Sequence, residues 1–480
     1  MAKMQTNIVH YSSTKKDSGL FRLDAEHYQK HYIENQNMLN KFGAVPLKAL
    51  LAQPVLTGHT PSMKIDAYYG GHIKFIKTNN LRDFKVTGIF NHHLSTLGND
   101  IIRRSSLKKD DLITTIIGAT HEIVGRTALI REEDLPANIN QNIALIRLKK
   151  SFSPEFLSTY LNSKVGRLAL WHLSRQTEQV NLNCREVESV LVPTCSKKLV
   201  RIIKTIYAAA VETENESKKA FKNAELTLLK EIGLSNWNPQ HILTFVNNYN
   251  ETISANRIDA EHYQPKYGEI VTIIKNYKHG WDILGNMVDL KDDNYIPDSN
   301  KFYKYIELAN ITDNSGITEP MYKEGQMLPS RARRIVNVGD VIVSSLEGSL
   351  TKIALIDIEH SQALCSTGFH VVSPHSIKPE VILVFLKSIA GQMQLKHRCR
   401  GTILPAINKT DFLNIKAPIF ENEIQDAIAR KVTSTANLRM KSRRLLKNAK
   451  KAVEIAVTHG EQEALGWLKT QAGDLDAPGL

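Results

Sequence analysis

The chain has 480 residues, which is too long for one ordinary hydrophobic core, so two or three domains are expected. Its 42% hydrophobic and 23% charged residues are typical of a globular protein, and no apolar run approaches the ~18 residues that a membrane span needs. The formal net charge of +13 favours polyanionic partners, although the same charge could serve solubility alone.

Residues that could bind a metal or form disulfides show no suitable spacing. No paired CxxC occurs among Cys184, Cys195, Cys365 and Cys399, so neither a zinc site nor a disulfide framework is predicted. His92 and His93 have no third ligand beside them, and no metal site is expected there. The first residues lack the apolar core of a secretory signal, and the cysteine usage fits a reduced, cytoplasmic location.

The most informative feature of the sequence is an internal repeat. FRLDAEHYQ at Phe21–Gln29 returns as NRIDAEHYQ at Asn256–Gln264, an offset of 235 residues. Three later matches follow in the same order: FIKTNNLRD with YIELANITD, KKDDLITT with NVGDVIVSS, and SPEFLSTYLNSKVG with KPEVILVFLKSIAG. The offset drifts to 225, as insertions in loops would make it. The sequence therefore predicts two copies of one unit, which agree at their ends and diverge in the middle.

Each half has the same predicted order of elements. A short polar helix around RxDAEHYQ comes first, followed by β-branched runs that Gly, Asn and Asp punctuate, which we interpret as strands and turns. The runs are HIKFIKT, DDLITTIIG and ALIRL in the first half and KYIEL, GDVIVSS and KIALIDI in the second. A helix opening at Ser153-Pro154-Glu155 follows, and Lys378-Pro379-Glu380 repeats it, with Pro in the first turn.

A long helix ends each half. Apolar residues recur at helical spacing from Leu199 to Leu228, and Gly233 is a natural stop. The second copy is expected from about Glu421 to Thr458. About 35 residues at ~1.5 Å each make a rod of roughly 50 Å, and two such rods can bury their apolar stripes against each other.

The predicted fold class is α+β, with two similar mixed α/β domains separated by a long antiparallel helical (coiled-coil) pair. The expected boundaries are 1–39 for the N-terminal segment with the first RxDAEHYQ motif, 40–194 for the first globular domain, 195–233 for the central helix, 234–280 for a linker with the second motif, 281–420 for the second globular domain, 421–458 for the C-terminal helix and 459–480 for a tail.

Several further stretches carry a resemblance to a known family. They are TGHTPS at Thr57–Ser62, Gly339-Asp340-Val341-Ile342 with Ser345 and Gly348, Arg400-Gly401-Thr402 with Ile407-Asn408, and Lys416-Ala417-Pro418 before the second long helix. In this duplicated order the chain resembles the specificity (S) subunits of type I restriction–modification systems, over residues 20 to about 457. The first half departs with Lys109-Asp110-Asp111 and Arg175-Gln176-Thr177, and the second half has no counterpart of TGHTPS.

The resemblance implies that each globular domain is a target-recognition domain for one half of a split, asymmetric site in double-stranded DNA. It also implies that the long helices set the spacing between the half-sites and dock two adenine-N6 methyltransferase (modification) subunits. Motor–nuclease (restriction) subunits could join. S-adenosylmethionine, and ATP with Mg²⁺, would be bound by these partners, so no cofactor is expected on this chain.

Motifs for catalysis are missing from the sequence. It contains no Asn/Asp-Pro-Pro-aromatic motif for amino-methylation, no GxGxxG loop and no GxxxxGK[ST] loop, so the chain is predicted to be a non-catalytic subunit. Three alternatives remain open. They are a self-sufficient DNA endonuclease, a coiled-coil adaptor without sequence preference, and the specificity subunit of a type IIB-like or methylation-only system.

The candidate DNA-binding residues are polar side chains in predicted loops, since Arg, Asn and Gln suit base edges and Lys, Ser and Thr suit phosphates. They are Lys77, Thr78, Asn79, Arg103, Arg104, His121, Arg175 and Gln176 in the first half, and Arg331, Arg333, Arg334, Ser345, Glu347, Ser349, Lys352, Arg400 and Thr402 in the second. Any one of them could instead be a solvated charge or a turn residue.

Partner docking is assigned to the two RxDAEHYQ motifs, whose near identity suggests one shared task, although a purely structural role is equally open. The residues are Arg22, Asp24, Glu26, Tyr28, Arg257, Asp259, Glu261 and Tyr263. A basic run on the second long helix is interpreted as a solvated face, with a DNA or acidic-partner surface as the alternative. It comprises Lys441, Arg443, Arg444, Lys447, Lys450 and Lys451.

Overall fold

The computed structural model describes residues 24–88, 90–176, 179–311, 320–401 and 403–471. The chain divides into two compact units. Unit 1 is made of Met1–Glu212 and Lys441–Leu480, and unit 2 is Thr213–Met440. The division runs through both long helices, so that each half of a helix belongs to the unit on which it packs.

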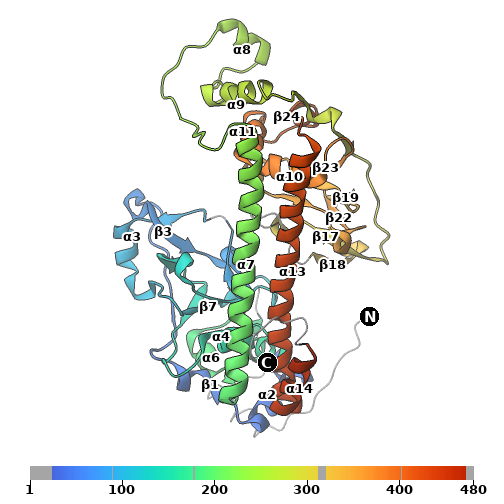
Figure 1. Cartoon of the computed structure of the whole chain (residues 1–480). Helices are drawn as coiled ribbons and strands as arrows, with labels where there is room; N and C mark the ends of the chain where they lie inside the picture. The colour runs from blue at the N-terminus through green and yellow to red at the C-terminus, as the bar shows by residue number, and fades with distance from the viewer. Residues whose placement is uncertain (1–23, 89, 177–178, 312–319, 402, 472–480) are drawn as a thin grey trace. The chain divides into compact units, whose positions relative to one another are not determined.

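Unit 1 is a mixed α/β fold (Figure 1). Its antiparallel four-stranded sheet has the order β2 (Leu56–Thr57), β11 (Ile143–Ile146), β7 (Leu112–Thr115) and β9 (Thr127–Leu129). One three-stranded sheet has the order β10 (Ala137–Ile139), β3 (Tyr69–Ile76) and β6 (His93–Leu94), and another has the order β12 (Arg175–Gln176), β13 (Val180–Asn181) and β8 (Ile117–Gly118). Two further sheets have two strands each, β1 (Val45–Pro46) with β14 (Leu191–Val192) and β4 (Leu81–Arg82) with β5 (Lys85–Val86). The shorter helices of unit 1 are α2 (Lys30–Phe42), α3 (Thr96–Ile101), α4 (Pro154–Leu161), α5 (Lys164–Leu173), α6 (Cys184–Ser189) and α14 (Glu461–Thr470).

Unit 2 has corresponding elements. Its antiparallel four-stranded sheet has the order β16 (Val288–Lys291), β23 (Phe369–Pro374), β20 (Val341–Ser344) and β21 (Ile353–Leu355). A mixed sheet has the order β18 (Met321–Glu324), β17 (Phe302–Ile306), β22 (Leu364–Ser366) and β19 (Ala332–Ile335), and β15 (Trp281–Ile283) pairs with β24 (Lys416–Pro418). The shorter helices of unit 2 are α8 (Tyr249–Ala255), α9 (Pro265–Lys275), α10 (Pro379–Lys387), α11 (Ile389–His397) and α12 (Lys409–Leu413).

The strand registers show that the two units share one topology. In unit 1 the Thr115 amide donates to the Arg126 carbonyl at 3.0 Å, and in unit 2 the Ser344 amide donates to the Lys352 carbonyl at the same distance. Each unit also has one parallel pair, β3 with β10 and β17 with β22. The predicted α+β fold class with an internal repeat is therefore confirmed.

The turn that precedes β7 and β20 resolves one departure between the halves. Asp110 and Gly339 both have positive φ, 69° and 87°, so Asp110 adopts the left-handed conformation that glycine takes in unit 2. The next residue is a buried aspartate in both units. Asp111 accepts from the Lys108 amide and Asp340 from the Asn337 amide, each at 2.7 Å. The same turn geometry thus survives the change from Gly-Asp to Asp-Asp.

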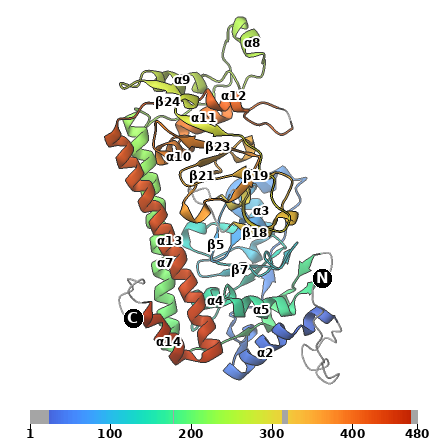
Figure 2. The same ribbon diagram turned by 90° about the vertical axis from the view of Figure 1, so that its right-hand side faces the viewer.

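The long helices are α7 (Lys197–Glu231) and α13 (Asn422–His459) (Figures 1 and 2). In unit 1 the first half of α7 packs against the second half of α13, and their buried residues join the core of α4, α5 and the four-stranded sheet. In unit 2 the second half of α7 packs against the first half of α13. Both helices have apolar residues at helical spacing, so each has an apolar stripe that is buried in the cores of the two units.

Buried hydroxyls add one equivalent hydrogen bond to each helix contact. The Ser442 hydroxyl donates to the Ala210 carbonyl at 2.7 Å in unit 1, and the Ser217 hydroxyl donates to the Thr435 carbonyl at 2.8 Å in unit 2. The repeat offset of 225 relates Ser217 to Ser442 and Ala210 to Thr435, so the two bonds are the same contact made twice.

Two sequence predictions need correction. Residues 461–470 were expected in a tail but form α14, because Ala464 and Leu468 lie one helical turn apart and are buried in the core of unit 1. The RxDAEHYQ motifs are not helices of their own. The first forms a 3-10 turn at Ala25–Tyr28 before α2, and the second is a turn that ends where Pro265 begins α9. Among the described helices, none combines the length and the hydropathy required of a membrane span.

The aspartate of the shared turn should carry much of the stability of unit 1. Asp111 is buried and accepts two bonds from the Arg147 guanidinium, at 2.7 and 2.6 Å. Asp111→Ala leaves Arg147 without this partner, and we expect a loss of about 3 kcal/mol. Faster amide hydrogen exchange in β7, β9 and β11, with β20 and β23 unchanged, would be the result.

The matched control is the neighbouring residue. Asp110→Gly keeps the positive φ and removes an exposed side chain, so exchange should stay as in the wild type. Equal exchange in Asp111→Ala and wild-type protein would show that the turn does not depend on this carboxylate.

Candidate nucleic-acid interface

Three loops of unit 2 meet at the ends of β20, β22 and the segment before α12. The Ser345 hydroxyl and amide both donate to the Gly368 carbonyl, at 2.9 and 3.0 Å. The Ile407 amide donates to the Ser345 carbonyl at 2.8 Å, and the Glu347 amide to the Pro405 carbonyl at 2.9 Å. Backbone bonds therefore fix the loop that carries Ser345, Glu347 and Ser349 against the loop that follows Arg400.

Basic residues surround this loop cluster. Arg331 adjoins it, because its carbonyl accepts from the Thr367 amide at 2.8 Å. Arg334 and Lys409 both form ion pairs with Asp292, which draws β19 and α12 to one carboxylate. Arg333 donates to the Ser330 carbonyl at 2.6 Å, and Lys352 to the Ile311 carbonyl at 2.9 Å. Most predicted DNA-binding residues of unit 2 thus lie on adjoining loops, while Thr402 lies outside the described residues.

Arg175 and Arg400 occupy the same place in the two units. Arg175 pairs with Glu186 at 2.9 Å, and Arg400 pairs with Asp411 at 3.1 Å. Each acid is the third residue of a short helix that an asparagine side chain caps, Asn183 or Asn408. Roughly half of each arginine side chain is exposed, 48% and 56%, so a guanidinium held by its own chain still faces solvent.

The other predicted residues of unit 1 are divided between two sheets. His121 lies beside Arg175, since its Nε2 is 3.4 Å from the hydroxyl of Ser174 and its ring packs on Trp171. Gln176 continues β12 after Arg175. The turn Thr78–Asn80 follows β3, and the exposed Arg103 and Arg104 follow α3, which packs on β3. The structure therefore brings His121, Arg175 and Gln176 to the β12 sheet and places the remaining predicted residues beside the β3 sheet.

The two RxDAEHYQ motifs make the same contact in both units. The His27 ring stacks on His172 with centroids 4.2 Å apart, and the His262 ring stacks on His397 at 4.3 Å. Tyr32 and Tyr267 continue the two stacks. His172 and His397 lie in the last turns of the helices that lead into the Arg175 and Arg400 loops. The motifs therefore support the base of the candidate loops.

The polar residues of the second motif complete this support. Arg257 donates to the Cys399 carbonyl at 3.0 Å and binds Asp259 at 2.7 Å, and this contact lowers the pKa of the Asp259 carboxyl. Glu261 accepts from the Tyr267 hydroxyl at 2.7 Å, and the Tyr263 hydroxyl donates to the Arg257 carbonyl at 2.7 Å. In the first motif Arg22 lies outside the described residues, whereas Asp24 and Tyr28 are half-buried and Glu26 is exposed. Partner docking by these residues stays a prediction.

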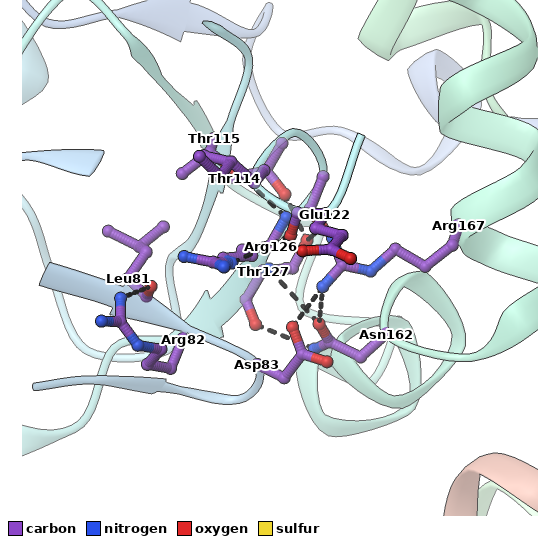
Figure 3. Close-up of polar contacts among 12 residues, drawn as sticks. Leu81, Arg82, Asp83, Thr114, Thr115, Glu122, Arg126, Thr127, Asn162 and Arg167 are labelled. Atoms are coloured by element: carbon purple, nitrogen blue, oxygen red, sulfur yellow. Dashed lines mark hydrogen bonds and ion pairs between the residues drawn. The ribbon is translucent and has the colours of Figure 1, made fainter. Parts of the chain in front are cut away.

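Sequence reasoning missed a group of arginines in unit 1, which Figure 3 shows around Asp83. Arg167 reaches Asp83 and Asn162, the half-exposed Arg82 ends β4, and the half-exposed Arg126 directly precedes β9. The repeat held a signal for one of them. The strand registers place Arg126 in unit 1 at the position that Lys352 occupies in unit 2, and Lys352 is one of the DNA-binding residues that the sequence predicts.

The loops after Arg175 and Arg400 differ in chemistry although their frames agree. In unit 2 the tip carries Ile403 and Leu404, which are 91% and 77% exposed. The repeat places Glu178 and Gln179 at these positions in unit 1. Within the described residues, no group of three or more His, Cys, Asp or Glu side chains is arranged to hold a metal ion.

Comparison with known proteins found a curated relative that is a type I specificity subunit. The chain is 29% identical over 137 residues to the type I restriction enzyme EcoBI specificity subunit of Escherichia coli, a match that covers 27% of this chain and 28% of the relative. The chain thus spans less than a third of the curated relative that it matches. No family model matches. The resemblance to type I specificity subunits that the sequence predicts is confirmed by this relative.

Solved structures of the same class also align with the chain. The type I restriction–modification S subunit from M. genitalium is 11% identical, with 86% of this chain and 94% of that chain covered and a TM-score of 0.35. The HsdS subunit from Thermoanaerobacter tengcongensis is 15% identical, with 87% and 96% covered and a TM-score of 0.29.

The histidine stack of unit 2 should make that unit sensitive to acid. Burial, with repulsion from His262, lowers the pKa of His397 to about 4. An unfolded histidine takes up a proton near pH ~6.5, so between about pH 6.5 and about pH 4 the unfolded chain binds a proton that the folded chain does not. The stability of unit 2 should therefore fall across this range, by about 3 kcal/mol from this site, and level off below it.

The measurement is the urea midpoint of unit 2 at a series of pH values, monitored by pulse proteolysis. His397→Phe keeps an aromatic ring in the stack and removes the titrating group, so its midpoint should depend less on pH. The same dependence in both proteins would assign the acid sensitivity to other groups.

Proposed function

We infer that the chain belongs to the specificity subunits of type I restriction–modification systems, and we propose that it reads a split, asymmetric site in double-stranded DNA. The observation that carries this proposal is one scaffold built twice with different loops. The central sheets of the two units share strand order and register, whereas the loop tips after Arg175 and Arg400 differ in residue type. Two similar frames with unlike loops suit two different half-sites.

Contacts to DNA fall into two kinds, and the loop residues supply both. Phosphate contacts position a protein on the duplex, and contacts to base edges select the sequence. Arg331, Arg400 and Arg175 can each give a bidentate contact to guanine, and Glu347 can accept from the amino group of cytosine. Ser345, Ser349 and Lys352 suit phosphates. The hydrogen bonds among the three loops of unit 2 would hold these loops in place before DNA binds.

Catalysis is assigned to partner subunits. The relative of known class is a specificity subunit, and the sequence contains no methyltransferase or phosphate-loop motif. We propose that two adenine-N6 methyltransferase subunits dock on this chain and bring S-adenosylmethionine, with the RxDAEHYQ motifs as docking candidates. Restriction subunits with ATP and Mg²⁺ would join a complete type I complex, and a type IIB-like or methylation-only system would use the same recognition subunit.

Methylation mapping tests the whole proposal. N6-methyladenine is mapped genome-wide in a host that expresses the chain with its neighbouring methyltransferase, and in a strain that lacks the chain. One split, asymmetric motif should lose methylation in the deletion strain. If no motif changes while the methyltransferase is expressed, the proposed function is wrong.

Domain exchange tests the assignment of one half-site to each unit. Residues 40–194 are replaced by the same region of a related subunit, and the methylated motif is mapped again. One half of the motif should change and the other half should persist. A change in both halves would contradict independent reading. The isolated chain with Mg²⁺ and plasmid DNA serves as the control for the endonuclease alternative, and no cleavage is expected.

A further inference from the structure

An arginine cluster in unit 1, formed by Arg82, Arg126 and Arg167 around Asp83, has more positive charge than its own chain neutralises. Arg167 is 8% exposed and forms an ion pair with the Asp83 carboxylate (Figure 3). Arg82 and Arg126 are half-exposed, and they act on each other as like charges. The Asp83 carboxylate thus acts on two of the three guanidinium groups, Arg167 and Arg82, and Arg126 forms no ion pair within the described residues.

Each arginine of the cluster is held in place by its own chain. Arg167 also donates to the Asn162 side chain at 3.1 Å and to the Val124 carbonyl at 3.3 Å. Arg82 donates through one terminal nitrogen to the Asn79 and Leu81 carbonyls, at 3.0 and 2.8 Å. Arg126 donates through Nε to the Glu122 carbonyl at 3.0 Å. Because these bonds restrict the side chains before any ligand binds, little rotamer entropy remains to be lost.

Terminal nitrogens of the cluster are available for an anion. Within the described part of the chain, the hydrogen bonds of Arg126 use its Nε and main-chain amide, so its two terminal nitrogens have no hydrogen-bond or ion-pair partner. Burial lowers the pKa of Arg82 and of Arg167, and the charge of Arg126 adds to both effects. An anion placed between Arg82 and Arg126 would relieve this repulsion and accept charge-assisted hydrogen bonds.

The cluster adjoins two groups of predicted DNA-binding residues. Arg82 binds the carbonyl of Asn79, which ends the candidate run of Lys77, Thr78 and Asn79. Arg126 binds the carbonyl of Glu122, which follows the candidate His121. The cluster therefore lies where the candidates of the two sheets of unit 1 come together.

The same frame in unit 2 carries less charge. The register aligns Arg126 with Lys352, and the repeat aligns Arg167 with Gln392. Gln392 donates to the Leu350 carbonyl at 3.2 Å, as Arg167 does to Val124, so the helix contact persists without the buried charge. The counterpart of Arg82 is Thr312, which lies outside the described residues. The extra arginines are thus not required by the frame.

We propose that Arg82 and Arg126 bind one backbone phosphate of double-stranded DNA, and that Asp83 and Arg167 are positioning residues that hold them. This inference rests on the proposed function, because DNA is the source of the phosphate. The site contributes affinity and register on the duplex and no choice of base.

The salt dependence of binding by the full-length chain tests the site. Affinity is measured against salt concentration for a duplex that contains the mapped target and for an unrelated duplex. Each lost phosphate contact should lower the slope of log affinity against log salt by about one. Arg82→Gln with Arg126→Gln should therefore reduce the slope and the affinity equally on both duplexes.

A neutral phosphate locates the contact. Methylphosphonate is substituted at each phosphate in turn, and one position should weaken binding by the wild type but not by the Arg82→Gln, Arg126→Gln variant. Arg201→Gln, on an exposed face of α7, removes one positive charge elsewhere in unit 1 and should leave the slope unchanged. Arg82→Lys keeps the positive charge and should retain most of the wild-type slope. This control distinguishes loss of charge from misfolding of unit 1.

The outcomes distinguish the two proposals. An unchanged slope in the double variant, or a loss confined to the target duplex, would overturn the phosphate site. A wild-type chain that binds both duplexes equally would overturn the proposed function, and the slopes would still report on the phosphate contact.

Discussion

The burial of one stripe along each long helix is the constraint on which both units depend. The first half of α7 covers α4 and α5 in unit 1 with Leu199, Ile203 and Ile206, and its second half enters the core of unit 2 with Ala224 and Leu228. One continuous helix thus supplies part of two cores. The buried hydroxyl bonds of Ser217 and Ser442 require their carbonyl partners, so a shift of one helix along the other would leave polar groups unsatisfied.

The scaffold shared by the two units separates residues that recur in both from residues that differ between them. The histidine stacks, the aspartate turns and the capped helices after Asn183 and Asn408 recur in both units. They lie at the bases of the loops, where they fix backbone geometry. Ile403 and Leu404, at the tip of the Arg400 loop, are largely exposed, so these side chains can change without loss of the core. Under the proposed function, this division would let one scaffold serve many DNA sequences.

The sequence predicted the repeat, the fold class and most elements, because hydrophobic periodicity and the order of matches act over whole segments. The helix that begins at Pro154, the strand within DDLITTIIG and both long helices are present in the structure. The tertiary contacts were not predictable. Nothing in the spacing of Arg82, Asp83, Arg126 and Arg167 indicates that they converge, since a strand register and a helix packing angle bring them together. The buried face of α14 was missed because only two of its residues enter the core.

The structural role found for the RxDAEHYQ motifs bears on how recognition and assembly would be coupled. His262 and Arg257 contact the two ends of the segment His397–Cys399, directly before Arg400. A subunit that docks on the outer residues of the motif would therefore press on the same segment that sets the direction of the Arg400 loop. Coupling of this kind would need no long pathway, because one turn of chain would lie between the proposed docking residues and the proposed DNA-binding loop. The support of a loop in both units accounts for part of the near identity of the two motifs, and contact with a partner by the same residues stays a prediction.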